Sequence, residues 1–115
     1  IVQDALTQFG DQVEVVFFNN DAMVLGALQA IQAAGRTVGE DIYLVGVDAL
    51  TDAVQNIIDG NMTGTVFNDH ITQSHTAADV AIGYINGEKQ DHYVGCDYVK
   101  VTKDNVDEIK ALLAK

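Results

Sequence analysis

The chain has 115 residues, of which 48% are hydrophobic, so it can bury a modest core as one ordinary domain. Its formal net charge of −11 argues against a nucleic-acid partner and against an anionic membrane surface, because both require a basic face. No apolar stretch reaches the roughly 18 residues that span a bilayer, so we do not expect this segment to insert into a membrane.

In chain order, the apolar patterns predict helices that alternate with short strands. Residues 1–9 are typical of a short amphipathic helix that Gly10 ends. The patterns that follow indicate three strand–helix pairs: strand 12–18 with helix 22–34, strand 42–47 with helix 50–58, and strand 64–67 with helix 71–86. Two short strand pieces, 93–96 and 98–101, and a last apolar helix complete the pattern.

Residues with capping side chains stand at the predicted helix starts. Asp21 is predicted to cap the helix 22–34, either Asp69 or Thr72 the helix 71–86, and Thr102 the last helix. Strands that alternate with helices in this way favour an α/β fold with a parallel sheet and right-handed crossovers. We find no internal repeat and no convincing linker.

Three apolar strand patterns end on polar side chains that suit hydroxyl groups: Asn20, Asp48 and Asn68. The carboxyl ends of parallel strands lie along one edge of a sheet, so we expect these side chains to meet at a polar ligand site, and the residue types suggest a sugar. Helix capping and turn formation explain the same strand ends about as well. Gly46 is interpreted as an opening through which a ligand approaches closely.

Evidence for catalysis is weak, and we expect a protein that is not an enzyme. The sequence contains no nucleophile elbow, phosphate-binding loop or dinucleotide fingerprint. Cys96, the single cysteine, excludes an internal disulfide and is expected to be a buried, inert thiol within a strand. His75 and His92 have no zinc-site spacing, and we interpret them as surface residues. For His70 a ligand contact is one option, and a solvent-facing histidine in the first helical turn is favoured.

Several segments, in this order, resemble the bacterial galactose/glucose-binding protein family: NNDAM (19–23), VGVDAL (45–50), GTVFND (64–69), YVGCD (93–97) and TKDN (102–105). These are solute-binding components of ABC sugar importers with the type I periplasmic-binding-protein fold, and in some bacteria they serve chemotaxis. The resemblance covers nearly the whole chain but only the C-terminal portion of the family sequence. It therefore implies a three-layer α/β lobe with a parallel sheet that is incomplete in this chain.

The resemblance also implies roles for individual residues. Asn20, Asp48 and Asn68 fall at positions that bind sugar hydroxyls in the family. Glu14 falls at a glutamate that completes a calcium site whose other ligands come from an upstream loop. Calcium takes about 6–8 oxygen ligands, so we expect no cofactor here, and calcium only in a full-length protein that carries that loop.

By the same resemblance, residues 1–67 form a segment of the C-terminal lobe, residues 68–92 cross a hinge and supply a helix of the N-terminal lobe, and residues 93–115 return. We therefore expect a fragment or processed chain whose partners are a monosaccharide, an ABC transporter permease and the remaining N-terminal segment of the same protein. The expected location is periplasmic or extracytoplasmic, with a lipid anchor as an option. The alternative is the effector-binding domain of a LacI-type transcription regulator, which shares the fold.

Overall fold

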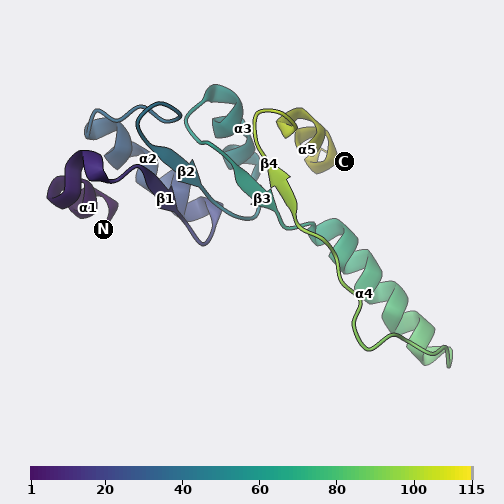
Figure 1. Ribbon diagram of the computed structural model, residues 1–115. Coiled ribbons are helices and arrows are strands. Elements are labelled where there is room, and N and C mark those ends of the chain that lie inside the picture. Colours follow the sequence, from purple (N-terminus) through teal and green to yellow (C-terminus); the bar gives the residue numbers. More distant parts are fainter. Residues whose placement is uncertain (115) are drawn as a thin grey trace.

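The computed structural model describes residues 1–114, which form five α-helices and four three-residue strands (Figure 1). In chain order these are α1 (Val2–Phe9), the 3₁₀ turn η1 (Gly10–Gln12), β1 (Val15–Phe17), α2 (Asp21–Ala33), β2 (Tyr43–Val45), α3 (Thr51–Asp59), β3 (Thr65–Phe67), α4 (His70–Ile85), β4 (Val99–Val101) and α5 (Val106–Leu113).

All five predicted helices are confirmed. They could be predicted because apolar spacing and helix-ending residues are local features of the sequence. Gly60, for example, closes α3 with a left-handed backbone, φ 83°. The strands are shorter than predicted, and the piece predicted over residues 93–96 is wrong, since those residues are irregular. The capping role predicted for Thr102 is also wrong: α5 begins after Asn105, whose side chain instead accepts a hydrogen bond from the Thr102 amide at 2.9 Å.

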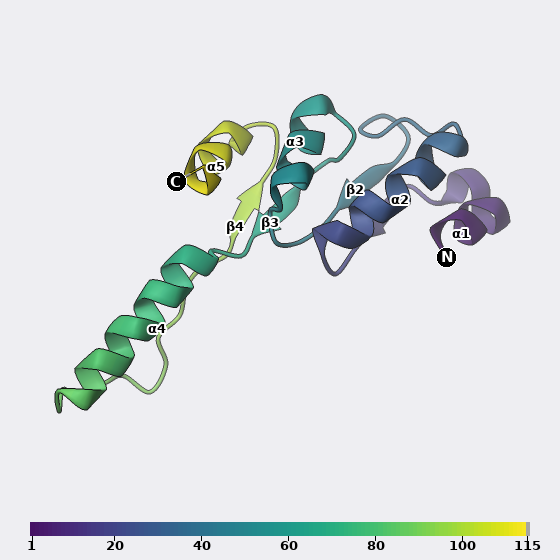
Figure 2. The same cartoon turned by 180° about the vertical axis from the view of Figure 1, so that it is seen from behind.

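The strands form two pairs, β1–β2 and β3–β4, and one isolated bridge joins the pairs in the order β1–β2–β3–β4. Strands β1 and β2 are parallel, with Val16 opposite Leu44, and a parallel bridge joins Val45 to Gly64, the residue before β3. Strand β4 pairs with β3 in the antiparallel direction, so the prediction of a parallel sheet is wrong for this strand. The reason is the path of the chain, which runs out along α4 and returns beside it, so that β4 begins where β3 ends (Figures 1 and 2).

One face of this small sheet is covered by helices, and the other is bare within residues 1–114. Helices α1, α2, α3 and α5 form a row in which each contacts the next. The strand side chains beneath them are buried, among them Leu44, Phe67 and Val101. On the opposite face, Val15 is 61% exposed and Phe17 is 64% exposed. The predicted α/β lobe, incomplete in this chain, is therefore confirmed, with two of its three layers in the described residues.

Helix α4 projects away from the rest of the molecule (Figures 1 and 2). We call residues 70–98, which are α4 and the segment that returns along it, the arm, and the other described elements the sheet lobe. Within α4 only Gly83 is buried. The radius of gyration, 18.1 Å, exceeds the value of about 13 Å for a compact domain of this length.

The predicted division into residues 1–67, 68–92 and 93–115 stays a prediction, and residue 115 lies outside the described residues. None of the helices within residues 1–114 has the length and apolar character that a membrane span requires.

Candidate ligand-binding site

Backbone hydrogen bonds bring three strand ends to one edge of the sheet. The amide of Asp21 donates to the carbonyl of Val47 at 2.8 Å, and the amide of Asp48 donates to the carbonyl of Val66 at 2.8 Å. These bonds continue the pairing beyond the last residues of β1 and β2. The side chains predicted to bind the ligand therefore share this edge, and all three are half-buried: Asn20, Asp48 and Asn68.

Asn20 occupies the N-cap position of α2. Its backbone is extended, φ −153° and ψ 165°, and its Oδ1 accepts a hydrogen bond from the Met23 amide at 3.0 Å. The capping role predicted for Asp21 is therefore wrong, because Asn20 holds that position. With Oδ1 engaged by the helix, the Nδ2 group of Asn20 is left to donate to a ligand.

Asp48 follows β2 in an unusual backbone conformation. Its φ is 112°, and the next residue, Ala49, has φ 56°. Non-glycine residues rarely adopt positive φ, and such positions gather at functional sites. Capping does not explain Asp48, since α3 has Leu50 at its N-cap position and that cap makes no side-chain hydrogen bond in the described chain.

Asn68 directly follows β3 and precedes Asp69, the residue before α4. Its Oδ1 accepts a hydrogen bond from Gln73 Nε2 at 2.5 Å, which fixes the amide and leaves Nδ2 to donate. The cap of α4 is the next residue: Asp69 accepts from the Thr72 amide at 2.9 Å, as predicted for Asp69. This hydrogen bond holds the pKa of the Asp69 carboxyl below its usual value.

The edge therefore presents two fixed amide donors, on Asn20 and Asn68, and one carboxylate that can only accept, on Asp48. Hydroxyl groups both donate and accept, so a ligand with several neighbouring hydroxyls can satisfy all three side chains at once. A ligand without hydroxyls would leave half-buried polar groups unpaired, which costs about 1–3 kcal/mol for each group.

Behind this edge lies Asp21, whose importance the sequence reasoning missed. It is fully buried, with 0% of its surface exposed. One oxygen accepts from the Thr65 hydroxyl at 2.7 Å and the other from the Leu50 amide at 3.0 Å. Burial raises the pKa of the Asp21 carboxyl, and the two hydrogen bonds oppose that rise. The sequence contains one signal of this role: two residues that cap helices equally well, Asn20 and Asp21, stand side by side where the helix needs only one.

Gly46 has a different role from the one predicted. A Cβ at this position would touch an Asp21 carboxylate oxygen and would lie 2.9 Å from Val24 Cγ2. The space beside Gly46 is therefore filled by core side chains and is not an opening for a ligand. Glycine is required there because it lets the Asp21 carboxylate approach β2.

The other reactive side chains do not form a catalytic arrangement in the described residues. His75 and His92 are exposed, as predicted. His70 is also exposed, and its ring packs edge-on against Phe67 with the ring centres 6.0 Å apart. Cys96 is only half-buried and lies outside any strand, so that prediction is wrong in both respects.

Glu14 lies exposed before β1, at the end of that strand opposite to Asn20. It lines a groove with the residues Asp11, Val15, Arg36, Glu40, Asp41 and Tyr43. Arg36 forms an ion pair with Asp41, in which Nε lies 3.1 Å from Oδ2. Residues 1–114 contain no group of three or more His, Cys, Asp or Glu side chains that could hold a metal ion. A calcium role for Glu14 would need ligands from an upstream loop, and it stays a prediction.

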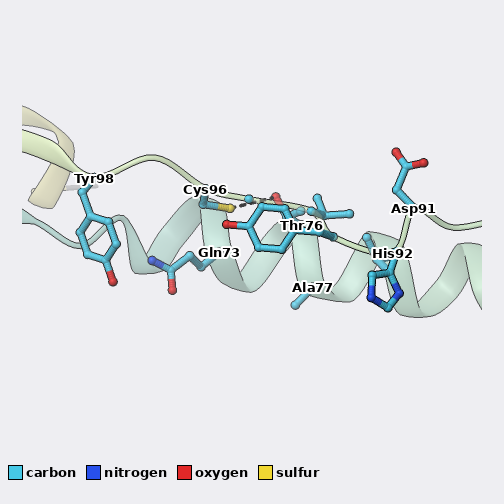
Figure 3. Close-up of a pocket in the computed structure, with 11 residues that line it drawn as sticks. Gln73, Thr76, Ala77, Asp91, His92, Cys96 and Tyr98 are labelled. Carbon is cyan, nitrogen blue, oxygen red and sulfur yellow. Dashed lines mark hydrogen bonds between the residues drawn. The ribbon is translucent and has the colours of Figure 1, made fainter.

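A second groove runs along the arm, between α4 and the returning segment (Figure 3). The residues labelled in that view include Gln73 and Thr76 on the helix and His92 and Cys96 on the segment. Cys96 Sγ lies 3.9 Å from Thr76 Oγ1. None of the three predicted ligand-binding side chains lines this groove, so we treat it as separate from the sheet edge.

Comparison with known proteins gives a consistent family assignment. Residues 1–89 match the model of the periplasmic binding protein domain. The chain is 36% identical over 107 residues to the D-galactose/methyl-galactoside binding periplasmic protein of Haemophilus influenzae, which covers 85% of this chain and 31% of that protein. It is also 36% identical over 104 residues to the xylitol-binding protein of Mycolicibacterium smegmatis, covering 89% of this chain and 28% of that protein.

Among solved structures, the Caulobacter myo-inositol binding protein bound to myo-inositol superimposes with a TM-score of 0.84 and 30% identity. That match covers 99% of this chain and 38% of the other. The chain thus spans about a third of the length of the relatives it matches.

Proposed function

Because this chain belongs to the periplasmic binding protein family and carries part of an α/β lobe of the type I fold, we propose that it is part of a solute-binding protein that reversibly binds a hexose, with galactose or glucose favoured. The observation that carries the proposal is the sheet edge with two fixed amide donors and one carboxylate acceptor: Asn20, Asn68 and Asp48. The chemistry is binding and release, not catalysis.

The ligand class follows from what the relatives share. Their names include galactosides, xylitol and myo-inositol, all of which carry neighbouring hydroxyl groups. We favour a hexose because the galactoside-binding relative has 36% identity over most of this chain. A wrong epimer would leave one buried polar group unpaired, at a cost of about 1–3 kcal/mol, and this cost would provide specificity.

In the proposed mechanism, this segment supplies the hydroxyl contacts of one lobe and the N-terminal segment of the same protein supplies the other. The two lobes close on the sugar in the periplasm or another extracytoplasmic space, and the closed form delivers it to an ABC transporter permease. Chemotaxis and a lipid anchor are further proposals of the same kind. The relatives named above are binding proteins, and no observation favours a LacI-type regulator.

The decisive experiment is calorimetry on the protein expressed from its complete coding sequence. The panel is galactose, glucose, ribose, arabinose, xylitol and myo-inositol. We expect Asp48→Ala to weaken binding of the preferred ligand at least about tenfold, because a carboxylate that accepts from hydroxyls contributes about 1.5–3 kcal/mol. Asp52→Ala, an exposed carboxylate in the first turn of α3, is the matched control and should leave the affinity unchanged. Equal affinities for wild type and Asp48→Ala would contradict the proposal.

A further inference from the structure

The turn that carries Asp48 is held in a conformation that its residue types do not favour. Asp48 and Ala49 both have positive φ, 112° and 56°, although both carry a Cβ. Such a backbone persists only where the surrounding structure holds it in place. A turn without those restraints would relax, and the Asp48 carboxylate would then point in many directions.

Apart from the bond that the Leu50 carbonyl accepts from Val54 in α3, this turn is joined to α2 and β3 by three hydrogen bonds. Two are made by the backbone: Asp21 N–H to the Val47 carbonyl and Asp48 N–H to the Val66 carbonyl, both 2.8 Å. The third comes from a side chain, because the Leu50 amide donates to Asp21 Oδ2 at 3.0 Å. Asp21 therefore binds the turn on both sides of Asp48. Its amide binds Val47, before Asp48, and its carboxylate binds Leu50, after Asp48.

The Asp21 carboxylate is itself held in place by the core. Its other oxygen accepts from the Thr65 hydroxyl at 2.7 Å, in a pair that joins α2 to β3. Gly46, which has no side chain, makes room for it beside β2. Asp21 is fully buried, and a buried carboxylate is unfavourable unless it is fully hydrogen-bonded. Helix capping does not explain this cost, since Asn20 already caps α2.

We propose that Asp21 is a positioning residue of the ligand site, which aims the Asp48 carboxylate by tethering the 47–50 turn through the Leu50 amide. This inference rests on the proposed function, because it assigns Asp21 a role in hydroxyl binding without contact to the ligand. What matters is the acceptor oxygen at this position and not the negative charge. An asparagine can keep its oxygen on the Leu50 amide and donate its Nδ2 to the Thr65 hydroxyl.

The test is a double-mutant cycle between positions 21 and 48 in the protein expressed from its complete coding sequence. Affinity for the preferred sugar is measured by calorimetry and stability by urea unfolding. We expect Asp21→Ala to weaken binding at least about tenfold in the wild-type background and to add less than about twofold in the Asp48→Ala background. The loss of stability should differ between the two backgrounds only by the repulsion between the Asp21 and Asp48 carboxylates, which is one of the smaller influences on Asp21.

Two variants separate positioning from general support of the core. Asp21→Asn should bind within about threefold of wild type, because it retains the acceptor oxygen. Thr65→Val removes the other partner of the same carboxylate and leaves the Leu50 tether. It should therefore lower stability but also bind within about threefold of wild type. In Asp21→Ala, hydrogen exchange of the Leu50 amide should accelerate at least about tenfold relative to Asp21→Asn.

The outcomes distinguish the two proposals. Wild-type affinity in Asp21→Ala together with weakened binding in Asp48→Ala would overturn the positioning role alone. A loss in Thr65→Val as large as in Asp21→Ala would also overturn it, because binding would then follow core stability. An unaffected Asp48→Ala would contradict the proposed function instead. If Asp21→Ala does not fold, Asp21→Ser, whose hydroxyl is one bond shorter than the carboxylate, takes its place with the same expectations.

Discussion

The sheet lobe and the arm are built from similar sequence patterns but bury their apolar side chains very differently. In the lobe, Leu44 and Ile57 are fully buried, while in the arm Ile85 is 81% exposed and Tyr84 is 75% exposed. Both regions form helices, because helix formation follows from local propensity and capping. The contrast teaches that burial depends on which elements the chain path brings together. The arm holds its shape as a helix without a core of its own.

The largest predicted effect is on the free energy of unfolding, when an apolar side chain is truncated in the lobe and in the arm. We expect Leu44→Ala to lower the free energy of unfolding of the 115-residue chain by about 2–5 kcal/mol, since it leaves a cavity between the sheet and the helices. Ile85→Ala in the arm should change it by less than about 0.5 kcal/mol. Urea unfolding followed by circular dichroism measures both. Equal losses would mean that the arm is covered in solution and would remove the contrast.

A second comparison uses two glycines of the sheet lobe. Gly46→Ala places a Cβ against Asp21 and Val24, and overpacking of this kind lowers the free energy of unfolding by about 1–3 kcal/mol. Gly26→Ala is the matched control. It lies within α2, and apart from the backbone of its own helix and its chain neighbours nothing lies within 4 Å of the new Cβ, so it should raise the free energy of unfolding by about 0.5–1 kcal/mol. If Gly46→Ala left the free energy of unfolding unchanged or raised it, the lobe would be less tightly packed around Asp21 than the structure indicates.

The third test concerns the pH dependence of the lobe. Burial raises the pKa of Asp21 above its usual value of 3.8, and the neighbouring charge of Asp48 adds to this rise. The folded state therefore retains the proton to higher pH than the unfolded state. The associated stability is fully present below pH 3.8 and is lost as the pH rises through the folded pKa. The free energy of unfolding of wild type minus that of Asp21→Asn should fall from pH 4 to pH 7 in urea titrations, and parallel curves would refute this.

The smallest effect should be confined to the arm. The hydrogen bond from the Thr72 amide lowers the pKa of Asp69, so its capping contribution is present above pH 3.8 and is lost as the pH falls through the folded value. Asp69→Ala should accelerate hydrogen exchange of the Thr72 amide without shifting the unfolding of the lobe. Asp69→Asn should keep the cap at all pH values, because an amide oxygen accepts the same bond without titrating. A shift in lobe unfolding would show that the two regions unfold together.

The predictable part of the fold is the part that local sequence determines. Helix α3 illustrates this: its apolar spacing and Gly60 at its end are visible without any structure. The direction of β4 was not predictable in this way, because it depends on the return path along α4. The same reasoning explains why the pieces at 93–96 and 98–101 looked alike, although only the second finds a partner strand.

The candidate site likewise has residues that the sequence predicts and residues that depend on distant contacts. Asn20, Asp48 and Asn68 were identified because polar side chains at the ends of parallel strands share one edge. Asp21 escaped notice because its two side-chain partners, Thr65 and Leu50, are distant in the sequence. The positive φ of Asp48 could not be predicted from the sequence either, because neither Asp48 nor Ala49 is a glycine. Whether the three edge residues contact a sugar stays a prediction until the binding experiment is done.

The close approach of the Asp21 carboxylate to Gly46, the residue after β2, also restricts how this sequence can diverge. A carboxylate and a Cβ cannot share that space, so neither position can change freely while the other keeps its residue. In an alignment of family members, positions 21 and 46 should therefore covary: a chain with a side chain at position 46 should carry a smaller residue at position 21. Such chains would have to restrain the turn after β2 by other means, and a glycine at position 48 or 49 would be the simplest, because glycine adopts positive φ without strain.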